Sequence, residues 1–166
     1  MKPFRQLPAV SRQRGLPAIG FELATDLELE PVGHVVRGSE RHNGRTIGEV
    51  ELEVFAASLV IDRDGVLEAK ASSVVGTNAL RVRLPGVRGY RAAAVGNAPL
   101  PYLYVYAMAA EGALDAGVLI TVRSAHPDWP AAAALLMSLR ILTRYGVVAA
   151  NDEQLDDTPI RRTLIE

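Results

Sequence analysis

The sequence predicts an α+β fold: an antiparallel β-sheet followed by one C-terminal α-helix, at about residues 129–145, that packs on one face of the sheet. Two observations predict it. Over residues 22–124 apolar and polar residues alternate in short runs separated by turns that contain glycine. Beyond residue 128 the apolar spacing changes to three and four, which is typical of a helix. Because strands and helix are segregated along the chain, the pattern argues against a doubly wound parallel sheet.

The strand predictions rest on period-two alternation bounded by turn residues. Asn43-Gly44 is the strongest turn signal in the chain, and residues 62–65 also read as a hairpin turn. Residues 66–75 fit either a strand or a short helix. The predicted strands are residues 22–30, 47–61, 80–84, 89–95, 100–109 and 117–124.

The helix prediction rests on its start signals and its apolar stripe. Asp128 is a suitable N-cap and Pro130 suits the first turn. No helix breaker follows before Gly146. We expect a single helix long enough to cross several strands, so that the other face of the sheet stays free.

The composition favours one domain with a substantial core, since 49% of the 166 residues are hydrophobic. The formal net charge of -1 argues against a dedicated nucleic-acid binder. With no cysteine, disulfides, thiolate nucleophiles and cysteine metal sites are excluded. We find neither a secretory signal nor an apolar run near the ~20 residues of a membrane span, and expect a cytoplasmic protein.

The chain divides into three parts. Residues 1–17 are rich in proline and predict an extended arm, residues 18–148 form the single α+β domain, and residues 149–166 form an acidic tail. Within that tail, residues 160–165 either fray or form a short strand that pairs with a sheet edge, for example on a second copy of the chain.

Candidate catalytic groups are sparse. Alternating glutamates in the strands of residues 22–30 and 47–61 fit a solvated sheet face, and Arg81 and Arg83 on a later strand would form cross-strand ion pairs with them. Ser124, His126 and Asp128 are the residue types of a hydrolytic triad, but they are too close in sequence to point at one another from separate loops. We expect no catalytic residue, no metal site and no cofactor.

A row of tyrosines is the most distinctive binding feature. Tyr102, Tyr104 and Tyr106 alternate with small apolar residues, so three phenols share one face of a strand. On an open face they would form a binding platform. They could equally pack under a loop or face the helix. On neighbouring strands, the cations that could frame such a platform for a peptide or acidic partner are Arg81, Arg83 and Arg123.

Residues 100–146 resemble the closing unit of the PsbP-like fold. The shared pattern is two strands, a Pro-Asp-Trp-Pro segment, and an Ala/Leu helix that ends in Ser138-Leu139-Arg140. Residues 88–92 also resemble the strand that precedes this unit. The family includes the PsbP proteins of photosystem II, a yeast nuclear-transport protein that binds Ran, LpqN-type lipoproteins and chaperones of type VI secretion effectors. The resemblance implies a non-enzymatic binding or chaperone module, and no functional residue transfers.

Three functions follow as hypotheses. The first is a protein-binding or chaperone-like module that uses a sheet face or edge, with another protein or a second copy of itself as the partner, as in a homodimer. The second is a small-molecule-binding protein or hydrolase with a pocket near Ser124 and His126. The third is a structural domain without a ligand.

Overall fold

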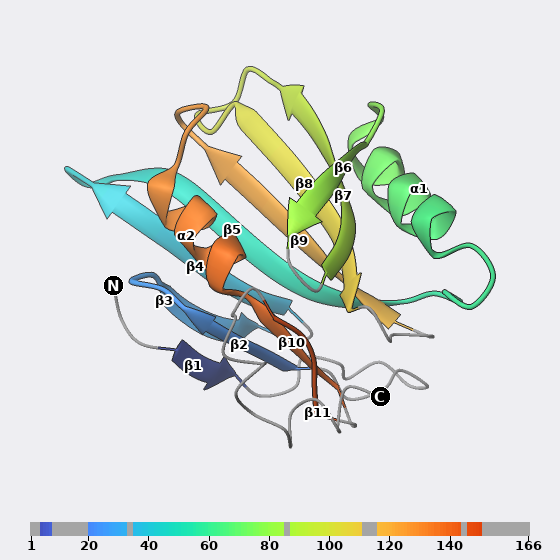
Figure 1. The fold of residues 1–166 in the computed structure, drawn as a ribbon. Coiled ribbons are helices and arrows are strands. Elements are labelled where there is room, and N and C mark those ends of the chain that lie inside the picture. Colours follow the sequence, from blue (N-terminus) through green and yellow to red (C-terminus); the bar gives the residue numbers. More distant parts are fainter. Residues whose placement is uncertain are drawn as a thin grey trace.

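A seven-stranded antiparallel sheet forms the centre of the computed structural model (Figure 1). The structure describes residues 4–7, 20–32, 35–84, 87–110, 116–143 and 146–150. The elements are β1 (Phe4–Leu7), β2 (Gly20–Ala24), β3 (Glu28–Val32), β4 (Val35–His42), β5 (Arg45–Ala56), α1 (Arg63–Val75), β6 (Leu80–Leu84), β7 (Val87–Val95), β8 (Tyr102–Ala110), β9 (Ala116–Ser124), α2 (Pro130–Ser138), β10 (Arg140–Thr143) and β11 (Gly146–Ala150). The predicted α+β class, its antiparallel sheet and the late helix are confirmed.

The strand order of the large sheet is β3-β4-β5-β9-β8-β7-β6. Strands β3 to β5 form one meander and β6 to β9 a second one, joined through α1. The second meander returns β9 to the edge of β5, so β5 and β9 lie in the middle of the sheet. Strands β3 and β6 are its two ends.

A smaller four-stranded sheet has the order β1-β2-β10-β11 and lies below the large sheet in Figure 1. The single strand predicted for residues 22–30 is therefore two strands that belong to different sheets. The chain turns between them at Thr25, a buried residue whose Oγ1 accepts a hydrogen bond from the Leu27 backbone N–H at 3.0 Å. Residues 1–3 and 8–19 of the predicted arm and domain start lie outside the described residues, as do residues 151–166 of the predicted tail.

The β4–β5 hairpin turns at the predicted dipeptide. Asn43 and Gly44 have φ values of 52° and 77°. Positive φ at both central residues defines the type I′ turn that suits the twist of a two-stranded ribbon.

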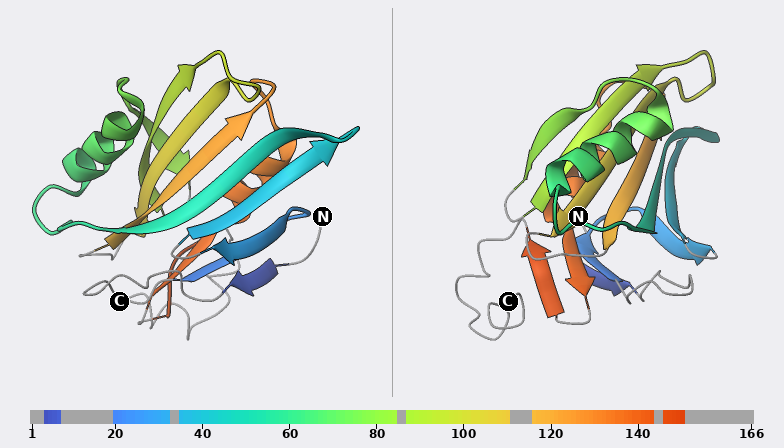
Figure 2. Two further views of the ribbon diagram at one scale, coloured as in Figure 1. Left: turned by 180° about the vertical axis from the view of Figure 1, so that it is seen from behind. Right: turned by 90° about the vertical axis from the view of Figure 1, so that its right-hand side faces the viewer.

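Both faces of the large sheet are covered in part, each by one helix (Figures 1 and 2). Along β5 the even-numbered residues 50, 52 and 54 face α2 and the odd-numbered residues face the other way. The α2-side core includes the buried side chains of Val50, Leu52, Ile120, Val122, Trp129 and Leu135. The α1-side core includes Phe55, Leu59, Leu67, Val105, Ala107 and Leu119. The expectation that one helix leaves the other face free is thus wrong.

Helix α1 begins where the sequence predicted a hairpin turn. The Asp62 carboxylate accepts a hydrogen bond from the Gly65 backbone N–H at 3.0 Å, which makes Asp62 the N-cap. Leu67 and Ala71, four residues apart, are the buried side chains of the helix. Gly76 ends it with a φ of 82° in the left-handed region. Residues 66–75, left open between strand and helix, are helical.

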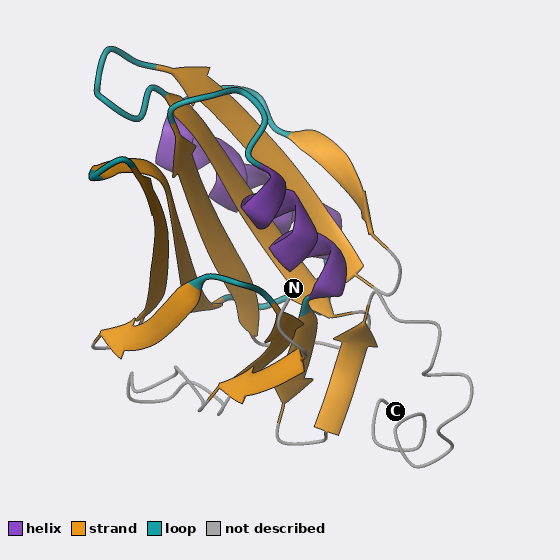
Figure 3. Cartoon of the chain, turned by 90° about the vertical axis from the view of Figure 1, so that its left-hand side faces the viewer, coloured by secondary structure: helices purple, strands orange, loops and turns teal. Residues whose placement is uncertain are grey.

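Helix α2 is shorter than predicted, since it ends at Ser138 and not near residue 145. Leu139 has extended backbone angles and β10 follows at once, paired with β2 and β11. Leu139 and Ile141 are 1% and 2% exposed, so the core takes alternate residues here, as in a strand. At its start Pro130 lies in the first turn as expected, but Trp129 and not Asp128 is the N-cap residue. Figure 3 shows how strongly strands dominate over these two short helices.

Trp129 fixes the start of α2 against the sheet. Its ring, 7% exposed, lies directly over Gly48 of β5, where a Cβ atom would overlap the indole. Its Nε1 donates a hydrogen bond to Glu40 Oε1 of β4 at 3.0 Å. Glycine is therefore required at position 48, because the Trp129 ring leaves no room for a side chain there.

We predict that Gly48→Ala lowers the free energy of unfolding by about 1–3 kcal/mol, because the added methyl group forces the indole off the sheet. Gly96→Ala is the matched control, since no atom lies within 4 Å of the position of its Cβ. It should change the free energy by less than about 1 kcal/mol. Urea unfolding followed by far-ultraviolet circular dichroism measures both. Equal stability of the two variants would show that Trp129 does not depend on the glycine.

Candidate functional site

A cavity with a volume of ≈ 580 Å³ lies between α2 and the part of the large sheet formed by β6 to β9. We call it the groove. Strand β6 forms one wall through Leu80, Val82 and Leu84, which alternate along the strand. Helix α2 forms the opposite wall, through Ala133, Met137 and other side chains. Apolar walls on both sides make this the principal candidate binding site in the described part of the chain.

The strand register positions the floor of the groove. Leu80 pairs with Arg91 of β7, and Arg91 pairs with Tyr106 of β8. Residues directly opposite one another in an antiparallel sheet point to the same side. Tyr104 lies two residues from Tyr106 on the same strand and lines the same cavity.

Arg91 and the two phenols form a polar cluster on this floor. The Arg91 guanidinium lies 5.3 Å from the centroid of the Tyr104 ring, a cation–π contact. Arg91 also lies close enough to the Tyr106 hydroxyl to lower its pKa through hydrogen bonding and charge. The Tyr104 hydroxyl donates a hydrogen bond to the Pro127 carbonyl oxygen at 3.3 Å. The cluster is therefore held in place before any ligand arrives.

Burial raises the pKa of Tyr106 above its ordinary value of 10.0. The Arg91 side chain partly opposes this, through its hydrogen bond and its charge, and the nearby Tyr104 adds a smaller increase. At neutral pH the phenol is neutral and can donate or accept a hydrogen bond in the groove.

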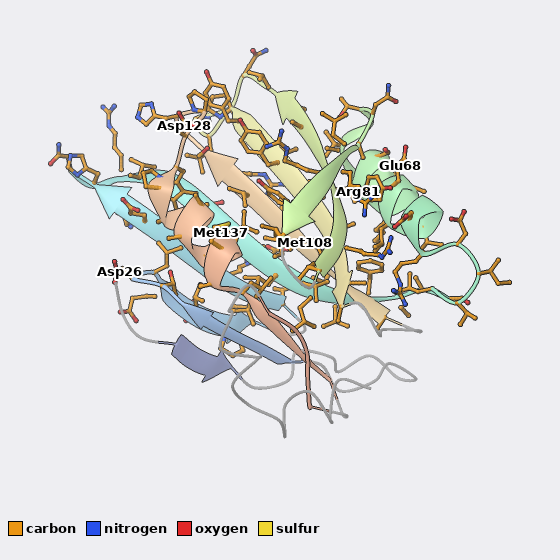
Figure 4. The ribbon with its side chains drawn as sticks, viewed as in Figure 1. Asp26, Glu68, Arg81, Met108, Asp128 and Met137 are labelled. Atoms are coloured by element: carbon orange, nitrogen blue, oxygen red, sulfur yellow. The ribbon has the colours of Figure 1, made fainter. Side chains whose placement is uncertain are left out.

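The rim of the groove is apolar and exposed to solvent. Leu80 on β6 is 66% exposed and Met137 on α2 is 56% exposed. Figure 4 labels Met137 on α2 and Arg81 on β6, the two elements between which the groove opens. Large apolar side chains on both sides of one opening are typical of a surface that receives another molecule.

The predicted tyrosine row lies on the α2 face of the sheet. Tyr102, Tyr104 and Tyr106 are all half-buried, and Tyr104 and Tyr106 pack against the α2-side core. The structure thus matches the alternative in which the tyrosine row faces the helix. Tyr104 and Tyr106 line the groove. Tyr102 does not belong to its lining and pairs with Val95 and Ser124 at the end of β8.

The three predicted arginines are separated. Arg81 lines the mouth of the groove, and Arg83 lies two residues further along β6, paired with Arg88. Arg123 of β9 pairs with Leu103 and Glu49 and lies on the opposite face.

The expected cross-strand pairing of Arg81 or Arg83 with the glutamate strands does not occur, because β7 is the only neighbour of β6 among the described strands. The acidic strands have their own cations. Arg37 of β4 forms an ion pair with Glu51 of β5 at 2.9 Å. Together with neighbouring glutamates and Arg123 these residues line a polar hollow of ≈ 370 Å³ on the α1 face.

Ser124, His126 and Asp128 do not form a triad. Ser124 is 1% exposed, and its hydroxyl donates a hydrogen bond to the backbone carbonyl oxygen of His126 at 2.7 Å. Its proton is thus directed to the main chain and not to an imidazole nitrogen. The contact stabilises the turn that leads from β9 to α2.

Among the described residues, no group of three or more His, Asp or Glu side chains could hold a metal ion. None of the described helices is long and apolar enough to cross a membrane. Comparison of the chain with protein-family models, curated proteins and solved structures gives no match. The groove is therefore the feature of the described residues that bears on function.

Most of the groove residues were not predicted as site residues, among them Arg91, Trp129 and Met137. The alternation of β7 puts Arg91 on a definite face of its strand, but the pairing with Tyr106 is needed to show that this face is the floor of the groove. Met137 lies on α2 but outside the apolar stripe that the sequence predicts for this helix. The position of α2 over the sheet is needed to show that Met137 lines the groove.

We predict that Arg91→Met raises the pKa of Tyr106 further, because the variant removes the hydrogen bond and the positive charge that lower it. Since the folded pKa lies above the unfolded one, the stabilisation from Tyr106 is complete below about pH 10 and is lost as the pH rises through the folded value. The loss should therefore be larger in the variant. Carbon-13 NMR of labelled tyrosine rings measures the titration. Arg123→Met, on the opposite face, is the control and should leave the pKa of Tyr106 unchanged.

Proposed function

We propose that this protein is a non-enzymatic module that binds another polypeptide, and that the groove receives apolar side chains of that partner. The single observation that carries the proposal is the groove of ≈ 580 Å³ between β6 and α2 with Leu80 and Met137 exposed on its rim. A partner that covers the rim removes both side chains from water. The groove also offers an aromatic and cationic floor to the side chains that enter it.

The energetic basis is hydrophobic burial on a prepared surface. Full burial of a Leu or Met side chain contributes ~1.5–3 kcal/mol, so covering the exposed parts of Leu80 and Met137 contributes roughly half of that for each. Tyrosine and arginine are frequent at the energetic centres of protein interfaces. Because Arg91 is already stacked on Tyr104, little side-chain entropy remains to be lost there on binding.

A relationship to the PsbP-like fold is part of the same proposal. The residues of that resemblance, 88–92 and 100–146, include β8, β9 and α2, which contribute the floor and one wall of the groove. The binding or chaperone role that the resemblance implies agrees with a polypeptide ligand. A cytoplasmic location and a homodimer, both expected from the sequence, belong to the proposal as well.

A small-molecule ligand is the second candidate. The volume of the groove falls within the roughly 300–1,000 Å³ that is typical of small-molecule pockets. Arg91 on its floor would favour a ligand with an anionic group. A hydrolase activity, which belongs to the same hypothesis, gains no support from Ser124, because its hydroxyl donates a hydrogen bond to the backbone carbonyl oxygen of His126.

We predict that Ala133→Arg weakens peptide binding. Ala133 is exposed and lines the groove, so an arginine there fills the cavity without disturbing the core. Peptides are first selected from a display library of random linear sequences with the wild-type protein as bait. Their dissociation constants, measured by titration calorimetry, should rise at least about tenfold in the variant, a loss of ~1.4 kcal/mol.

The matched control is Ala69→Arg, the same change at an exposed position of α1. It should leave the affinities unchanged. Peptides that bind both variants as tightly as the wild type would place the binding site elsewhere. Failure to select any peptide, combined with saturable binding of small carboxylates that Ala133→Arg removes, would favour the small-molecule hypothesis.

A further inference from the structure

The outer edge of β6 has no neighbouring strand among the described residues, because β6 ends the seven-stranded sheet. None of its five residues is proline, so alternate residues direct backbone N–H and C=O groups to this edge, where no described strand pairs with them. The same strand is a wall of the groove. A free edge and an apolar groove thus lie side by side on one element.

The side chains of β6 divide between its two faces. Leu80, Val82 and Leu84 line the groove on the α2 side. Arg81 pairs with Tyr90, and the Tyr90 ring packs against the α1-side core. Arg81 therefore projects from the α1 face of β6, next to the opening of the groove. Arg81 is exposed, and no carboxylate of the described residues forms an ion pair with it. The edge is apolar on one face and cationic on the other.

We propose that β6 accepts an extended segment of the partner polypeptide as an additional strand, and that this segment alternates apolar with acidic residues. The inference rests on the polypeptide-binding function proposed above and names its mode and partner chemistry. In an added strand successive side chains point to opposite faces. The apolar set enters the groove beside Leu80 and Val82, and the acidic set faces Arg81. Main-chain hydrogen bonds along the edge supply affinity and the groove supplies specificity.

The opposite end of the sheet does not offer the same surface. Strand β3 carries Pro31, which has no N–H to donate, and its exposed glutamates Glu28 and Glu30 repel an acidic segment. Its neighbouring hollow is polar and holds no apolar wall comparable to that of β6. The two ends of the sheet therefore differ in hydrogen-bonding capacity and in charge, and only β6 fits the proposed ligand.

A second copy of the chain fits β6 poorly. An antiparallel pairing of two β6 strands centred on Val82 puts Arg81 of one copy opposite Arg83 of the other. Like charges directly opposite one another destabilise a strand pair. The charge of the edge thus favours a different segment of acidic character.

The test uses a capped peptide that alternates valine with glutamate, and an analogue in which every glutamate is lysine. In spectra of the nitrogen-15-labelled full chain, the glutamate peptide should shift the amide signals of residues 80–84. It should bind about three- to tenfold more tightly than the lysine peptide. Arg81→Glu should reverse that order. Arg45→Glu, an exposed arginine on β5, is the matched control and should preserve it.

Backbone methylation tests the added strand itself. Methylation of the alternate peptide amides on one side should abolish binding, and methylation of those on the other side should be tolerated, because only one side of a strand donates to β6. Equal effects of the two patterns, or none, would overturn the inference.

The outcomes separate the two proposals. If the valine–glutamate peptide causes no shifts at about 1 mM while library-selected peptides still bind in an Ala133-dependent way, the added strand is wrong and the polypeptide-binding function stands. If neither binds, both fail. Concentration-dependent self-association that shifts the amide signals of residues 80–84 would identify a second copy as the occupant and would overturn the acidic-partner inference.

Discussion

The contact of Trp129 with Gly48 is the constraint on which the groove depends. The indole lies flat on the backbone of β5 and is tied to β4 through its hydrogen bond to Glu40. These contacts hold the N-terminal end of α2 over the middle of the large sheet. Because α2 is one wall of the groove, the position of this single ring sets the width and direction of the opening. A glycine in the middle of a long strand would otherwise only weaken it.

Burial on two sides explains why the sheet carries two helices. Strand β8 places Val105 and Ala107 against α1, where they are fully buried, and Tyr104 and Tyr106 on the α2 side, where they are half-buried. The two rows differ in size. Small apolar residues allow α1 to approach closely, whereas the phenols keep the other layer at a distance and leave room for a cavity. The groove is a consequence of large side chains beneath a short helix.

The sequence predicted the fold class well because alternation is a local signal. Residues 80–84 form a strand with the predicted bounds, and Asn43-Gly44 forms the predicted turn. The errors arise where local signals are ambiguous. Residues 62–65 fit a hairpin turn, but they fit the start of a helix equally well, because Asp62 can accept a hydrogen bond from the Gly65 N–H as an N-cap. The partners of Arg81 could not be predicted, because they depend on the strand order, which no local pattern encodes.

The error in the length of α2 has a functional meaning. A helix over residues 129–145 would span about 25 Å and cover most of the sheet, whereas the nine residues of α2 span about 14 Å, close to three strand spacings. The chain leaves the helix because Leu139 and Ile141 are buried as alternate residues at the junction with the small sheet. Core packing at that junction therefore ends the helix at Ser138. Met137 therefore lies in the last turn of α2, where it is exposed on the rim of the groove.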